Sequence, residues 1–139
     1  MANTAVESGP RLIAFVLPSI PESVPIARLH VRVALGFHGL GEYANDVETI
    51  TSELVTNAVR HVCDYGTQTI GIALARAWNP AAVTVSVSDS SPEGPIRRDT
   101  STDSEQGRGL QIVEALSAHW GWHQKDGGKA VFATLAWEA

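Results

Sequence analysis

The chain has 139 residues, of which 44% are hydrophobic and 18% are charged. This length suits one domain with a substantial core, and the composition excludes a largely disordered chain. The net charge of −5 comes without a basic run that could neutralise nucleic-acid phosphates, so direct nucleic-acid binding is not expected.

The start of the chain and its cysteine content bear on its location. The first ten residues lack the positive region of a secretory signal, and the apolar run LIAFVL is too short to span a membrane. Cys63 is the only cysteine, so no internal disulfide can form. We therefore expect a cytoplasmic protein with no membrane contact. A flexible arm at residues 1–10 should precede a single domain at residues 11–139.

Apolar periodicity predicts a strand and then a helix at the beginning of this domain. The run RLIAFVL, residues 11–17, favours a strand and stops at Pro18. Ser23 is the expected N-cap residue of the helix, with Pro25 in its first turn. The apolar side chains that recur at helical spacing are Ile26, Leu29, Val33 and Phe37.

A second helix is predicted from Asn45 to about Cys63, with Asn45 and Glu48 as a capping pair. Alternating apolar residues then predict strands at residues 67–77 and 82–88, joined as an antiparallel hairpin. The second of these strands delivers Asp89 at its end.

The last third of the chain begins with an irregular polar stretch that we expect to be a loop, residues 90–106. A loop of this length in a compact domain is usually functional or disordered. A third helix is predicted to open at Gly107. Two final strands, at residues 120–125 and 130–137, should be joined by a tight turn.

Glu53, Asn57 and His61 form a polar row on the second helix, because residues four apart share one helix face. The row lies at the edge of the apolar face of the same helix. Burying an unpaired carboxylate or amide costs about 1–3 kcal/mol or more, so a ligand or protein hydrogen bonds should compensate for it. An ordinary surface rim at the edge of the core is the alternative interpretation.

The segment Gly107-Arg108-Gly109 at a predicted helix start suggests an anion site. Backbone N–H groups there lack partners, and the helix dipole favours negative charge. A plain glycine turn is the alternative interpretation of this short pattern.

Three motifs occur in a fixed order: E-x-x-x-N on a helix, D-x-S-x-x-x-P at a strand end, and G-x-G-L before a helix. Together they resemble the GHKL ATPase superfamily. The phrases SELVTNAVRH, GRGLQIV and GGKAVFATL are most similar to the anti-sigma factor serine/threonine kinases of bacterial partner-switching systems, and the resemblance covers residues 15–135. It implies a two-layer α/β sandwich, with a mixed, mostly antiparallel sheet, helices on one face, and ATP held beneath a lid at residues 90–106.

The resemblance also implies roles for individual residues. Asn57 would coordinate Mg²⁺ through its carboxamide oxygen, which suits a hard cation that also bridges phosphates. Glu53 would be the general base. Asp89 would accept hydrogen bonds from the adenine amino group, because a carboxylate only accepts. Gly107 and Gly109 would let backbone amides approach the phosphates. The remaining positions expected around the nucleotide are His61, Ser91, Pro95, Leu110 and Thr134.

Two departures from the family pattern bear on catalysis and subfamily. Glu105 stands where the kinases carry a basic residue near the γ-phosphate, and Arg108 could supply the missing charge. Ser91 replaces a glycine, which marks a variant subfamily. The resemblance implies a homodimer that binds a sigma factor and phosphorylates an antagonist protein with Mg·ATP. The alternatives are a partner-sequestering module without kinase activity and, with less support, a detached histidine-kinase catalytic domain.

Overall fold

The computed structural model describes residues 10–60, 68–90, 105–125 and 127–137, and for residues 105–109 it describes the backbone alone. The elements in chain order are β1 (Arg11–Pro18), α2 (Ser23–Phe37), a 3₁₀ turn η1 (Gly41–Tyr43), α3 (Ala44–Arg60), β2 (Thr69–Trp78), β3 (Ala81–Asp89), α4 (Glu105–Leu116), β4 (His119–Lys125) and β5 (Gly128–Ala136).

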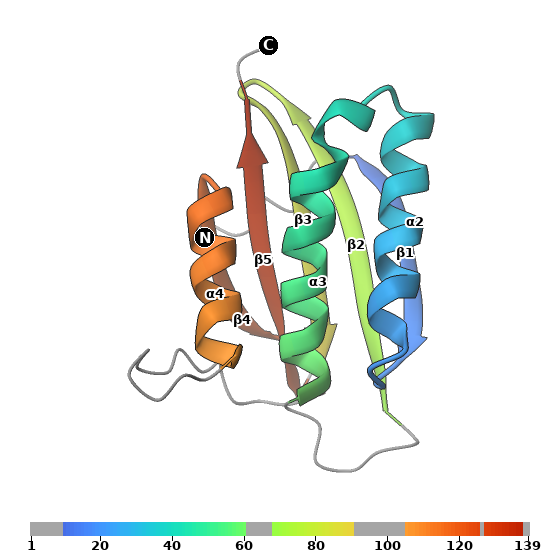
Figure 1. Ribbon diagram of the computed structural model, residues 1–139, viewed down its shortest axis with the longest axis vertical. Coiled ribbons are helices and arrows are strands. Elements are labelled where there is room, and N and C mark those ends of the chain that lie inside the picture. The colour runs from blue at the N-terminus through green and yellow to red at the C-terminus, as the bar shows by residue number, and fades with distance from the viewer. Residues whose placement is uncertain (1–9, 61–67, 91–104, 126, 138–139) are drawn as a thin grey trace.

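The five strands form one sheet in the order β1-β2-β3-β5-β4. Helices α2, α3 and α4 lie on one face of this sheet, and the ribbon view shows the other face without a helix (Figure 1). The two-layer sandwich expected from the sequence is therefore confirmed. Every pairing between the described strands is antiparallel, so the expected mixture of strand directions is absent from this part of the chain.

The core lies between the helices and the central strands. Side chains alternate across a strand, so every second residue of β3 and β5 faces the helices. On these strands the helix-facing residues of the core are Val83, Val85, Val87, Val131 and Ala133. From the helices they meet Val31, Leu35, Val47, Ile50, Leu54 and Val55, which are all less than 2% exposed.

The start of α2 differs from the expected N-cap. Ser23 is the first residue of the helix rather than its cap, and its hydroxyl donates a 2.6 Å hydrogen bond to the carbonyl oxygen of Pro18. Glu22 occupies the cap position without a side-chain hydrogen bond. Ser23 is fully buried, so its hydroxyl has to find a partner inside the protein, and the end of β1 supplies one.

The start of α3 also differs, because the helix begins at Ala44, directly after η1. Asn45 therefore lies inside the helix and cannot cap it. Glu48 is 5% exposed and forms ion pairs with two arginines of α2, at 2.6 Å from Arg32 and 3.6 Å from Arg28. The predicted capping pair is thus wrong: Glu48 joins the two helices.

Replacing Arg32 with methionine should lower the free energy of unfolding by about 1 kcal/mol, because buried Glu48 loses its closest cation while Arg32 itself is half exposed and screened. Urea unfolding of Arg32→Met, Glu48→Gln and the double variant would measure the coupling. If Arg32→Met costs as much in the Glu48→Gln background as in the wild type, the pair does not contribute to stability.

The element boundaries agree with the predictions within about three residues, and two of the differences lie near the predicted site. Helix α3 ends at Arg60, and residues 61–67, which include the predicted end at Cys63, lie outside the described residues. Helix α4 begins at Glu105, two residues before the predicted start. Among the described residues, no helix is both long and apolar enough to cross a membrane.

Candidate functional site

Four segments that are far apart in the sequence meet at one end of the molecule. Figure 1 shows the end of α3, the start of α4, the end of β3 and the start of β5 at the lower end of the view. Helix α3 contacts α4, β3 and β5. The antiparallel course of β3 and β5 brings the end of one strand beside the start of the other.

Asn57 lies near this end of α3 and has an unusual environment. Its side chain is 6% exposed, and its Oδ1 atom is buried with no hydrogen-bond partner among the described residues. A buried acceptor without a partner costs about 1–3 kcal/mol, and such exceptions in a native fold call for a specific reason. Glu53 lies one helical turn earlier and is partly buried. The carboxylate and the carboxamide therefore share the helix face predicted from their spacing.

The orphan Oδ1 of Asn57 fits a magnesium ion. A neutral amide oxygen is a suitable ligand for a hard cation, and Mg²⁺ commonly takes one or two protein ligands and completes its shell with water and phosphate oxygens. The described residues contain no group of three or more His, Cys, Asp or Glu side chains that could hold a metal ion. Water and phosphate oxygens would complete the shell of a cation bound at Asn57.

Asp89 is the last residue of β3, as predicted, and it forms a buried ion pair. The Nζ atom of Lys129 lies 3.1 Å from Oδ1 and 2.9 Å from Oδ2 of Asp89. The contact to Oδ1 has hydrogen-bond geometry, whereas the contact to Oδ2 is an ion pair without that alignment. The side chain of Asp89 is 1% exposed and that of Lys129 is 0% exposed. Removing one partner of a buried pair commonly lowers the free energy of unfolding by about 3–5 kcal/mol.

Gly128, the first residue of β5, lies very close to the backbone at the end of β3, next to the Asp89–Lys129 pair. A Cβ atom on Gly128 would overlap the carbonyl oxygen of Asp89 and lie 2.8 Å from the Cα of Ser90. Only a glycine fits there, because the obstacle is backbone and cannot rotate away.

Gly128→Ala should therefore destabilise the fold by about 1–3 kcal/mol, the range for overpacking at a site that cannot relax. The matched control is Gly36→Ala in α2, where an added Cβ meets nothing within 4 Å and should stabilise the helix by about 0.5–1 kcal/mol. Thermal melts of both variants would test this. Equal melting temperatures for the two variants would contradict the close approach.

The glycine pair of the third motif lies inside α4. Gly107 and Gly109 are the third and fifth residues of the helix Glu105–Leu116, so they do not precede it as predicted, and residues 105 and 106 belong to the helix rather than to the lid. The first four N–H groups of a helix lack intrahelical partners, so the amide of Gly107 still belongs to the anion-binding end. Leu110 follows and is 2% exposed.

The remaining predicted residues divide into two groups. His61, Ser91, Pro95, the side chain of Arg108 and most of the expected lid lie outside the described residues. Thr134 lies on the opposite face of the sheet, where its hydroxyl is 2.8 Å from that of Thr84. Thr134 is five residues from Lys129 along β5, and an odd separation in a strand reverses the face. The structure therefore does not bring Thr134 together with Asn57.

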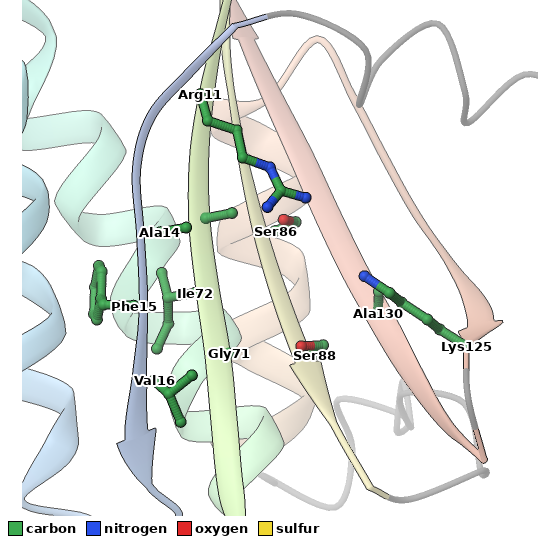
Figure 2. Close-up of a pocket in the computed structure, with 11 residues that line it drawn as sticks. Arg11, Ala14, Phe15, Val16, Gly71, Ile72, Ser86, Ser88, Lys125 and Ala130 are labelled. Carbon is green, nitrogen blue, oxygen red and sulfur yellow. The ribbon is translucent and has the colours of Figure 1, made fainter.

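The helix-free face of the sheet carries two shallow grooves that are separate from Asn57. One has a volume of about 270 Å³ and the other about 310 Å³, and neither is lined by Glu53 or Asn57. In the first groove the side chain of Arg11 reaches toward Ser86, and that of Lys125 toward Ala130 (Figure 2).

Lys129 is the residue of this region that the sequence motifs did not reveal. A lysine at a strand start is ordinarily expected at the surface. The pairing of β5 with β3 determines its partner, because that register puts Lys129 directly opposite Asp89.

Comparisons with known proteins agree with this architecture. Residues 17–135 match the model of the histidine kinase-like ATPase domain. A similar solved structure is the histidine kinase domain of the blue-light activated histidine kinase from Erythrobacter litoralis EL346, with a TM-score of 0.52 and 17% sequence identity. The match covers 86% of this chain and 61% of that one, so the chain spans less than two thirds of the longer protein. No curated protein matches the chain.

The family match covers most of the chain and contains all three motifs. The similarity to the solved kinase domain supports the same fold, an antiparallel sheet with helices on one face. The chain therefore belongs to the histidine kinase-like ATPase domain family, of the GHKL type.

Proposed function

We propose that this protein binds Mg·ATP at the end of α3 and acts as a serine/threonine kinase that regulates transcription by partner switching. The observation that carries the nucleotide part is the buried, unpartnered Oδ1 of Asn57, one turn after Glu53, in a chain of the ATPase domain family. Bound Mg²⁺ would neutralise phosphate charge. Asp89, the start of α4 and Asn57 would then contact the adenine, the phosphates and the cation, respectively.

The resemblance to anti-sigma factor kinases supports the kinase part of the proposal. Glu53 would accept the proton of a serine or threonine hydroxyl on an antagonist protein. The hydroxyl oxygen would form a bond to the γ-phosphorus as the bond to the bridging oxygen breaks, releasing ADP. The same protein, as a homodimer in the cytoplasm, would sequester a sigma factor until the antagonist displaces it. These partners rest on the phrases shared with that family.

Glu105 supports the second candidate function, an ATP-binding or nucleotide-independent module that sequesters a partner without phosphorylating it. Phosphoryl transfer depends largely on positioning and charge stabilisation, so an acidic residue where the kinases carry a basic one would weaken transfer more than binding. Arg108 is the cation within the motif that could compensate.

Two measurements separate these candidates. Calorimetric titration with ATP, with and without magnesium, tests the nucleotide site, and no binding in either condition would refute it. Incubation with labelled ATP and candidate antagonist proteins then tests transfer. Label on an antagonist supports the kinase, whereas tight magnesium-dependent binding without label on any antagonist supports the module.

A further inference from the structure

The first groove on the helix-free face of the sheet receives basic side chains from both edges of the sheet. Arg11 belongs to β1 and Lys125 to β4, which are the two edge strands. Figure 2 shows the side chain of Arg11 extending over the sheet toward Ser86, and that of Lys125 extending from the other edge toward Ala130. The guanidinium and the ammonium therefore approach the same groove from opposite sides.

The described residues form no ion pair with either Arg11 or Lys125. None of the described residues that line the first groove is acidic. The adjoining groove is lined by Asp89, but the buried carboxylate of Asp89 already pairs with Lys129. A concave surface lined by charges of one sign concentrates ions of the opposite sign, even on a protein whose net charge is −5.

Small side chains make the floor of the first groove. Ala14, Ala73 and Ser86 lie side by side on β1, β2 and β3, because they are partners in the sheet register. Gly71 and Ser88 form a neighbouring pair of the same register. The hollow above them has a volume of about 270 Å³, and the two serine hydroxyls that line it can donate hydrogen bonds. Ligand pockets commonly start at about 300 Å³, so the hollow suits a small molecule.

We propose that this groove is a second binding site, for a small molecule that carries a phosphate group. A phosphate has three strong acceptor oxygens, so it can accept from the guanidinium of Arg11, the ammonium of Lys125 and the hydroxyl of Ser86 together. Membrane surfaces and nucleic acids are bound through larger clusters of cations than these two. The groove is not lined by Glu53 or Asn57, so this inference does not depend on the proposed nucleotide site.

The test follows the backbone amides of the isotope-labelled, full-length protein by nuclear magnetic resonance during titration with inorganic phosphate. Titration with acetate at the same ionic strength gives the comparison with a carboxylate. Phosphate should shift the amides of Gly71, Ser86 and Ser88 to saturation, and acetate should bind more weakly. Arg11→Gln and Lys125→Gln should each raise the dissociation constant for phosphate by about two- to fivefold, the range for exposed ion pairs.

Two further variants control for charge and for shape. Arg28→Gln removes a half-exposed positive charge from α2, on the other face of the sheet, and should leave the dissociation constant for phosphate unchanged. Ala73→Leu keeps both cations of the groove but fills its floor, so it should remove the saturable shifts. The dispersion of each spectrum shows whether that variant folds. If Ala73→Leu does not fold, the comparison of Lys125→Gln with Arg28→Gln decides alone.

Three outcomes would overturn the inference. The first is an equal response of the groove amides to phosphate and acetate. The second is an equal loss of phosphate affinity in Arg28→Gln and Lys125→Gln, which would indicate a general effect of charge. The third is a set of phosphate-dependent shifts confined to the start of α4, which would place the anion at the proposed nucleotide site only.

Discussion

Asn57→Ala is expected to lower the affinity for Mg·ATP by about 10- to 100-fold, because a contact to a charged ligand is worth about 1.5–3 kcal/mol. Affinity for ATP in the absence of magnesium should change much less. The buried Oδ1 atom has no hydrogen-bond partner among the described residues, so removing it breaks no such contact there. The melting temperature of the ligand-free protein should therefore change little.

Calorimetric titration with and without magnesium, together with thermal melts, checks this expectation. Asn57→Asp is the matched control, because it keeps an oxygen ligand at the same position and should retain magnesium-dependent binding. A large drop in melting temperature for ligand-free Asn57→Ala would show that the side chain supports the fold instead. An equal loss of affinity with and without magnesium would show that Asn57 contacts the nucleotide rather than the cation.

Glu53→Gln is expected to lower the rate of phosphoryl transfer by about 10²- to 10⁴-fold, the usual contribution of a general base. Glutamine has nearly the same shape, so the affinity for Mg·ATP should stay close to that of the wild type. Single-turnover transfer of labelled phosphate to an antagonist protein measures the rate, and titration measures the affinity. Glu114→Gln, at an exposed position of α4, is the control for losing one carboxylate.

The outcome of the Glu53→Gln experiment also separates the two candidate functions. If the variant transfers phosphate at the wild-type rate, Glu53 is not the base. If neither protein transfers phosphate while both bind Mg·ATP, the sequestering module is the better description. In that case Glu105, which stands where the kinases carry a basic residue, is the expected cause of the missing transfer, and Arg108 does not compensate for it.

Much of the architecture was predictable because it depends on local pattern. Alternating apolar residues marked the strands, and helical spacing marked α2 and α3. The position of Asp89 at a strand end and the shared helix face of Glu53 and Asn57 follow from the same periodicities. These features depend on neighbours within a few residues, so one sequence is enough to find them.

The side-chain partners were not predictable in the same way. The positions of Ser23 and Glu48 near predicted helix starts favour helix caps, but both residues are buried and bond instead to partners on β1 and α2. The resemblance implies a place for Thr134 at the nucleotide, whereas the β5 register puts this residue on the other face of the sheet.

By itself, the sequence determined the order of helices and strands, the family motifs and the helix row that carries Glu53 and Asn57. Only the tertiary structure decided that β5 inserts between β3 and β4, and that Lys129 therefore meets Asp89 in the interior. The physical reason is that periodicity records which face of an element is buried. The partner on that face is set by strand pairing and helix packing between residues that are distant in the chain.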